Sequence, residues 1–321
     1  MGVSWIGVTL LSTKPILIDC RYVFPKYAAA YLIVEKKRAL FVENNTSHAV
    51  LILLDELAKA GLKPTQVEYL IVTHAHLDHA GGSSALIQAC PNATLLAHPR
   101  AAKHLIDPSK LIQGARQVYG DQVFEELYGQ IDPIPANRVR EIQDGEEIEF
   151  GSRLLRFFYT RGHAKHHFCV FDSRANGVFT GDSFGIAYPA LQRKGLFIFP
   201  STSPVDFEPN EARISIQKIM DSGAERAYLT HFGEVGEMSQ AAGQLLGHLD
   251  FHEKLLDRVV SSNLDDKEKL SFCQKELNSY FHEKLSLIGL GSDSLLWDIL
   301  RPDIELNAAG LVYASQKRKT A

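Results

Sequence analysis

The residues best suited to chemistry form the pattern H-x-H-x-D-H, in which His74, His76, Asp78 and His79 lie close together. They follow an apolar, β-rich run at 67–73, which predicts a buried strand. His74 and His76 are two residues apart in extended backbone, so both imidazoles leave the same face at the end of the strand. Neutral imidazoles with one carboxylate are the ligands of a borderline divalent metal such as zinc. The segment therefore predicts a metal site.

For any one of these histidines a plainer interpretation exists, because a lone histidine at a strand end is usually solvated or hydrogen-bonded. Three histidines and an aspartate in so short a segment favour metal ligation. Gly81 and Gly82 come directly after the pattern, and we expect them to let the backbone turn tightly beside the site.

Three further motifs follow predicted strands downstream. They are a Gly-His pair at 162–163, a Gly-Asp pair at 181–182, and a histidine, His231, after the apolar run 227–230. In this order, and together with the first motif, they resemble the signature of the metallo-β-lactamase superfamily. The resemblance covers about residues 15–235.

The resemblance implies an α/β fold, an αββα sandwich with a two-metal site at one edge of its sheets. Carried over position by position, it implies that His74, His76 and His163 hold one metal, that Asp78, His79 and His231 hold the second, and that Asp182 bridges both. The implied cofactors are two divalent ions, zinc first, with iron or manganese as alternatives because imidazole and carboxylate suit all three.

The chemistry implied by the resemblance is hydrolysis by a metal-bridging hydroxide, with no serine or cysteine nucleophile. Asp78 and Asp182 are the expected catalytic residues: Asp182 as the bridge, and Asp78 as the group that orients the nucleophile or passes a proton. The substrate would be a small ester, thioester or lactone, as in the glyoxalase II-like and lactonase-like branches. His76 favours hydrolysis, since redox di-iron members typically carry glutamate at this position.

Two other classes remain open at this point. One is a metal-binding effector or regulatory protein with little turnover, and the other is a phosphodiesterase or nuclease of the same fold. The segment at 181–188, GDSFGIAY, departs from the GDTLFxxGCGR of glyoxalase II-like enzymes, which puts glutathione thioester specificity in doubt.

A second tier of residues has a weaker case. The third motif reads GHAKHH where glyoxalase II-like proteins have GHTxGH, so His166 or His167 is expected either to support a ligand or to be solvated. Lys165 could meet an anionic substrate group or simply be solvated. Aromatic residues after the ligand segments are expected either to line a pocket or to pack in the core: Phe184, Tyr188, Phe199 and Phe232.

The elements that must position these residues read as two β-rich halves. Strands are predicted at 15–20, 29–34, 38–43 and 67–73, then at 91–98, and again at 139–150, 153–160, 167–171, 177–180 and 227–230. The polar residues 44–47 are expected to cap a helix that ends near Gly61.

The helical segments suggest how the chain is divided. A helical insertion is predicted at about 99–131, broken at 119–120, and it could form a lid over a pocket or pack on an edge. Helical periodicity at 209–222 and from 236 onward predicts a metallo-β-lactamase-like domain at 1–235 and a helical C-terminal extension at 236–321 packing on it.

Composition limits the partners. The 321 residues have a formal charge of −4 and no Lys/Arg block except 317–319, so no nucleic acid is expected as a partner. No apolar run is long enough to span a bilayer, and no signal peptide is evident, so we expect no membrane association and a cytoplasmic protein with a small-molecule substrate. A homodimer is left open. The four dispersed cysteines, Cys20, Cys90, Cys169 and Cys273, are expected to be buried thiols.

Overall fold

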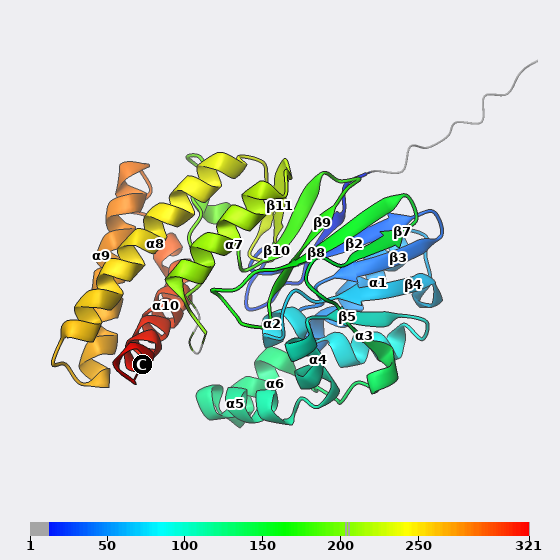
Figure 1. Ribbon diagram of the computed structural model, residues 1–321, viewed down its shortest axis with the longest axis horizontal. Coiled ribbons are helices and arrows are strands. Elements are labelled where there is room, and N and C mark those ends of the chain that lie inside the picture. Colours follow the sequence, from blue (N-terminus) through cyan, green and yellow to red (C-terminus); the bar gives the residue numbers. More distant parts are fainter. Residues whose placement is uncertain (1–12, 203, 205, 321) are drawn as a thin grey trace, which may run out of the picture.

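The computed structural model describes residues 13–202, 204 and 206–320 (Figure 1). Two six-stranded sheets form its centre. The first has the order β1 (Ile16–Asp19), β2 (Ala29–Glu35), β3 (Arg38–Val42), β4 (Val67–Ile71), β5 (Thr94–Ala97) and β6 (Val139–Glu141). The second has the order β12 (Gly233–Val235), β11 (Arg226–Leu229), β10 (Gly177–Gly181), β9 (Phe168–Asp172), β8 (Arg153–Tyr159) and β7 (Glu147–Phe150). Residues 1–12, in which no signal peptide is evident from the sequence, lie outside the described residues.

The two sheets pack face to face through alternate residues of their strands. On β2, Tyr31 and Ile33 belong to the core between the sheets, whereas Ala30 and Leu32 face the other way. Phe168 and Val170 on β9 meet the first pair from the second sheet. Successive side chains of a strand point to opposite faces, and both sets are apolar here because both faces of the strand are buried.

Helices cover both outer faces. The first sheet is covered by α1 (Val50–Lys59) and α3 (Ser83–Ala89), which contribute Leu53, Leu57 and Leu86 to the outer core. The second is covered by α7 (Pro209–Asp221) and α8 (Met238–Ser261), as Figure 1 shows. The layers are therefore helix, sheet, sheet, helix, and the predicted αββα sandwich is confirmed.

Three helices occupy the predicted insertion: α4 (Pro99–Ile106), α5 (Ser109–Tyr119) and α6 (Asp121–Tyr128). The predicted break is present at Gly120, whose φ of 79° is readily adopted by glycine, and a second break at 107–108 was not predicted. Phe124 and Tyr128 pack on Leu77, which lies between two of the proposed ligands. The insertion thus touches the segment that carries the H-x-H-x-D-H pattern.

The C-terminal part is helical as predicted, with α8, α9 (Asp266–Leu287) and α10 (Ser294–Thr320). Figure 1 shows them beside α7 at one end of the sandwich. Their apolar stripes join a single core with the outer face of the second sheet, which includes Leu249, Leu277 and Leu311. All four cysteines are free and buried, as predicted. No helix in the described part of the chain is long and apolar enough to cross a membrane.

A histidine inside this helical core predicts acid sensitivity. His252 on α8 is fully buried, its Nδ1 donates to the carbonyl of His248 at 2.7 Å, and its Nε2 has no partner among the described residues. Burial lowers the pKa of His252 to about 4. As the pH falls from 6.5 toward 4, the unfolded chain takes up a proton that the folded chain does not. This imidazole therefore lowers the free energy of unfolding by about 3 kcal/mol across that range.

Urea unfolding at pH 7.5 and pH 4.5 measures this contribution. His252→Leu should lose less stability on acidification than the wild type, whereas His282→Leu, at an exposed position of α9, should lose as much as the wild type. An equal acid loss in His252→Leu and the wild type would show that other groups carry the effect.

Candidate metal centre

The predicted ligands lie in four loops at one edge of the sandwich. His74, His76, Asp78 and His79 come after β4, the last two on the short helix α2 (Leu77–Ala80). The loops after β8, β10 and β11 supply the remaining three, His163, Asp182 and His231. Loops that are far apart in the sequence meet because the strands that carry them end at the same edge.

The first group of ligand atoms consists of three imidazole nitrogens. His74 Nε2 lies 2.8 Å from His76 Nδ1, and His163 Nε2 lies 3.0 Å from the same atom. All three side chains could bind one ion. Burial, followed by the neighbouring imidazoles, holds the pKa of His74 and of His76 well below the usual value, and burial also lowers that of His163. The three rings are therefore neutral donors at pH 7.

The second group consists of Asp78, His79 and His231. Asp78 Oδ2 is 3.3 Å from His231 Nε2 and 3.7 Å from His79 Nε2. Burial opposes the charged imidazolium of His79, but the carboxylates of Asp182 and Asp78 outweigh it and raise the pKa of His79 well above its usual value. The same balance raises the pKa of His231. The negative charge of the carboxylates therefore favours a cation at this group.

Asp182 lies between the two groups. Its Oδ1 is 3.3 Å from His79 Nε2, and its Oδ2 is 3.3 Å from His163 Nε2. Burial opposes its charged form, yet the surrounding histidines, His79 first, keep the pKa of Asp182 well below its usual value. One carboxylate thus presents one oxygen to each group.

The donor set fits metal ions. Both ring nitrogens of His79 and the Oδ1 of Asp182 are buried without a hydrogen-bond partner among the described residues. Buried polar atoms are normally paired, because leaving one unpaired costs about 1–3 kcal/mol. Imidazole and carboxylate donors converging within 4.8 Å of one another, some of them otherwise unpaired, are what a divalent ion of the zinc type requires.

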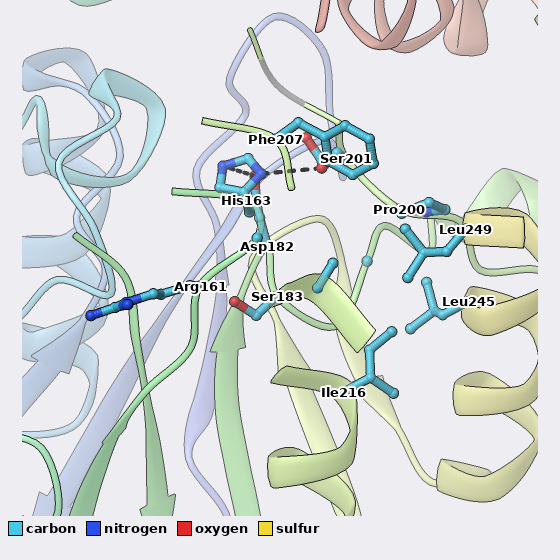
Figure 2. Close-up of a pocket in the computed structure, with 13 residues that line it drawn as sticks. Arg161, His163, Asp182, Ser183, Pro200, Ser201, Phe207, Ile216, Leu245 and Leu249 are labelled. Carbon is cyan, nitrogen blue, oxygen red and sulfur yellow. Dashed lines mark hydrogen bonds and ion pairs between the residues drawn. The ribbon is translucent and has the colours of Figure 1, made fainter. Parts of the chain in front are cut away.

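Main-chain carbonyls fix the orientation of two ligand rings. The Nδ1 of His163 donates to the carbonyl of Ser201 at 3.3 Å, a bond drawn in Figure 2, and the Nδ1 of His231 donates to the carbonyl of Tyr27 at 2.9 Å. Each bond occupies Nδ1, so Nε2 is the ring atom that faces the centre and can bind a metal. Neither Ser201 nor Tyr27 was predicted, since a carbonyl acceptor leaves no signal in the type of its residue.

The two second-tier histidines lie against ligand segments. His166 Nδ1 accepts from the backbone N–H of Ala75 at 3.3 Å, between His74 and His76. His167 is fully buried, and its Nε2 accepts from the backbone N–H of Asp182 at 3.3 Å. Both therefore hold the backbone beside proposed ligands, and neither contributes an atom to the ligand groups.

The other second-tier residues are spread over different environments. Phe184 is fully buried in the core that the C-terminal helices complete, and Phe199 belongs to the same core. Phe232 packs against the core between the sheets. Tyr188 is also buried, and its ring stacks on Tyr27 at 4.9 Å. Lys165 pairs with Asp206 at 3.4 Å and borders a pocket of about 260 Å³ that carries charges of both signs.

The prediction of a helix cap near the first motif is wrong. The polar residues 44–47 do not cap α1 with a side chain, since a 3-10 turn (Ser47–Ala49) leads into the helix. Instead, Asn45 Nδ2 donates to the carbonyl of Asp78 at 2.8 Å. Gly81 and Gly82 lie between α2 and α3, and their φ values of −62° and −80° are open to any residue. A Cβ on Gly82 would lie 2.7 Å from the Thr46 carbonyl oxygen, so close approach explains this glycine.

Glu43 is a further residue that the sequence reasoning missed. Its side chain is buried at the end of β3, where Oε1 accepts from the backbone N–H of Thr73 at 3.3 Å and lies 3.6 Å from His79 Nδ1. An acidic residue that directly follows a buried apolar strand is a signal that could have identified it, because burial of a carboxylate needs a compensating partner.

A small cavity of about 20 Å³ adjoins the centre (Figure 2). His163, Asp182 and Ser183 border it on the side of the sheets, and Ile216, Leu245 and Leu249 border it on the side of α7 and α8. Two of the proposed ligands, His163 and Asp182, therefore face a cavity that the helices covering the second sheet also border.

Comparisons with known proteins agree with this geometry. The family model described as the metallo-beta-lactamase superfamily matches residues 29–231, a range that includes all the predicted ligands. The metallo-beta-lactamase fold-containing protein ST1585 of Sulfurisphaera tokodaii is 29% identical over 188 residues, which are 57% of this chain and 64% of that protein. The hydroxyacylglutathione hydrolase of Synechococcus sp. is 28% identical over 131 residues, which are 41% of this chain and 39% of that enzyme. The matched regions thus span less than two thirds of either relative.

Solved structures show the likeness in fold. The archaeal metallo-beta-lactamase superfamily protein ST1585 from Sulfolobus tokodaii superposes with a TM-score of 0.63 at 24% identity, covering 94% of this chain and 99% of that one. The metallo-beta-lactamase family protein TTHA1429 from Thermus thermophilus gives 0.61 at 18% identity, with 96% and 93% covered. Motifs, layers and family match agree, and the chain belongs to the metallo-beta-lactamase superfamily.

Proposed function

We propose that the protein is a metal-dependent hydrolase of a small ester, thioester or lactone, with two divalent ions, zinc first, held by the seven predicted ligands. The observation that carries the proposal is the pair of ligand groups joined by one carboxylate. His74, His76 and His163 form a set of three imidazoles, Asp78, His79 and His231 form a set of one carboxylate and two imidazoles, and Asp182 offers one oxygen to each.

Bound divalent ions lower the pKa of water toward neutrality and polarise a carbonyl oxygen, which is the chemistry that ester cleavage needs. The chain must then handle a proton, and Asp78 is placed to do so. Its side chain is 27% exposed, whereas that of Asp182 is only 6% exposed. Asp78 can therefore reach both the centre and solvent, and we assign to it the acceptance of a proton from the attacking water and the transfer of that proton to the leaving group.

The arrangement around Ser183 supports hydrolysis without a serine nucleophile. Ser183 Oγ lies 3.1 Å from His167 Nδ1, which resembles a nucleophile and its base. However, His167 Nε2 accepts a backbone N–H, so the ring proton sits on Nδ1. Nδ1 therefore cannot accept the proton of the serine hydroxyl. Ser183 Oγ is moreover bonded to Thr160 Oγ1 at 3.1 Å. This pair is a support for the Asp182 loop.

The preference for carbonyl substrates is supported by the sequence likeness to a hydroxyacylglutathione hydrolase, a thioesterase by its name. The likeness covers only part of both proteins, and 181–188 departs from the glyoxalase II-like pattern, so we propose the thioester, ester and lactone class and not the glutathione thioester itself. A phosphodiesterase and a metal-binding effector are the outcomes against which the proposal is tested.

Purified protein with its metal content measured should be assayed against panels of thioesters, lactones, carboxylic esters and phosphodiesters. We expect two equivalents of divalent metal and turnover in one of the carbonyl panels. His74→Ala should lose bound metal and should lose turnover. His282→Ala, which changes a histidine outside the ligand groups, is the matched control and should behave as the wild type. Turnover of phosphodiesters alone would show a phosphodiesterase in place of the proposed carbonyl hydrolase. Metal-loaded protein that is inert in every panel would favour a metal-binding effector.

A further inference from the structure

Two buried polar residues of α10 connect the C-terminal extension to the proposed ligands. Asp303 and Asn307 are four residues apart, so they share one face of the helix, and both are buried. Their neighbours Leu300, Ile304 and Ala308 belong to the apolar core. Polar side chains in such surroundings are destabilising unless they are hydrogen-bonded, so their partners show what the helix face is built to hold.

Asn307 holds the segment that orients His163. Its Nδ2 donates to the carbonyl of Pro200 at 3.1 Å, and its Oδ1 accepts from the backbone N–H of Thr202 at 2.7 Å. These two bonds bracket Ser201, whose carbonyl accepts from His163 Nδ1. A single amide side chain therefore fixes the position of the acceptor that sets this ring.

Asp303 holds a second segment, which leads to His231. The hydroxyl of Tyr188 donates to Asp303 Oδ1 at 3.3 Å, and the Tyr188 ring stacks on Tyr27 with the ring planes 16° apart. The carbonyl of Tyr27 accepts from His231 Nδ1. In addition, the backbone N–H of Ala187 donates to the carbonyl of His231 at 2.5 Å, so the segment that contains Tyr188 touches His231 directly.

We infer that α10 is a positioning element of the metal centre, in which Asn307 fixes the orientation of the His163 imidazole and Asp303 fixes that of the His231 imidazole. The inference rests on the metal-binding role proposed above for these two histidines. One ring belongs to each ligand group, so one helix face acts on both halves of the centre. Residues that hold ligand rings in this way typically change metal affinity or activity by about 10–100-fold when removed. α10 lies outside residues 29–231, the part of the chain that the family model matches.

The inference is tested by metal affinity, measured with Zn²⁺ against a chromophoric chelator and with Co²⁺ by its visible absorption bands. Asn307→Leu and Asp303→Leu should each weaken Zn²⁺ binding by about 10–100-fold and alter the Co²⁺ spectrum. Asp303→Asn should stay near the wild type, because an amide oxygen can still accept from Tyr188. Glu305→Ala, at an exposed position on the same helix, is the matched control and should bind as the wild type does.

Tyr188→Phe keeps the stacked ring and removes only the hydroxyl that bonds Asp303, so it tests the same connection if a leucine variant fails to fold. We expect about a 10-fold weaker affinity. Wild-type affinity and spectrum in Asn307→Leu and Tyr188→Phe would overturn the role of α10 while leaving the proposed centre intact. A wild-type protein that binds neither Zn²⁺ nor Co²⁺ would overturn the centre and this inference together.

Discussion

Asp182→Ala is expected to lose bound metal and to lower hydrolysis by more than about 100-fold, beyond what the removal of a supporting residue costs. The reason is geometric, because the two carboxylate oxygens face different ligand groups: Oδ1 is 3.3 Å from His79 and Oδ2 is 3.3 Å from His163. Removing the side chain also removes negative charge that both groups share. The measurement is metal stoichiometry by elemental analysis together with kcat on the best substrate of the carbonyl panels.

Asp182→Asn refines this prediction. The amide has the same shape but keeps only one oxygen, so it should retain metal in one group better than in the other and give an intermediate stoichiometry. Asp221→Ala, which removes an exposed carboxylate that bonds Gln217 on α7, is the control for a general effect of charge. Two equivalents of metal in folded Asp182→Ala would refute the bridging role.

The proposed ligands could be picked out from the sequence because they are side chains in short motifs that follow strands. β4 lies in one sheet and β10 and β11 lie in the other, so the resemblance to the superfamily, and not the strands alone, predicted that His74, Asp182 and His231 meet at one edge. The same four motifs, in this order, also predicted the αββα fold.

The surroundings of the proposed ligands could not be predicted, because they depend on contacts between distant segments. Asn45 looks like a helix cap from its local sequence, yet its side chain bonds the Asp78 carbonyl because parallel pairing places β3 beside β4. Ser201 and Tyr27 act through carbonyls, which every residue has. Asn307 lies in a helix whose periodicity indicates packing, and only its burial shows that it holds another segment.

A second large effect is expected far from the centre, where Arg153 joins the two sheets. Its guanidinium bonds Asp172 on the neighbouring strand β9, lies 3.4 Å from Glu35 on β2 of the other sheet, and donates to the carbonyl of Thr13 at 2.9 Å. The three charged side chains are at most 5% exposed. Arg153→Met should therefore lower the free energy of unfolding by about 3–5 kcal/mol, since it leaves the buried carboxylate of Asp172 without a positive partner, whereas Glu35 keeps Arg174 at 3.3 Å.

The dependence on pH and the position of Arg153 separate this effect from any change in the centre. Burial already raises the pKa of Asp172 although Arg153 is beside it, and losing the arginine should raise that pKa further. A carboxyl whose pKa is higher in the folded state destabilises the fold as the pH rises through that value, so Arg153→Met should be less destabilising at pH 5 than at pH 8 in urea titrations.

Arg301→Ala, which removes an exposed partner of Asp298, is the control for Arg153→Met and should change stability by less than about 1 kcal/mol. Arg153 begins β8 and His163 follows its end, so the two are roughly 20 Å apart along the strand. Folded Arg153→Met should therefore bind metal as the wild type does. A loss of metal without a loss of stability would show that the two ends of the strand are coupled.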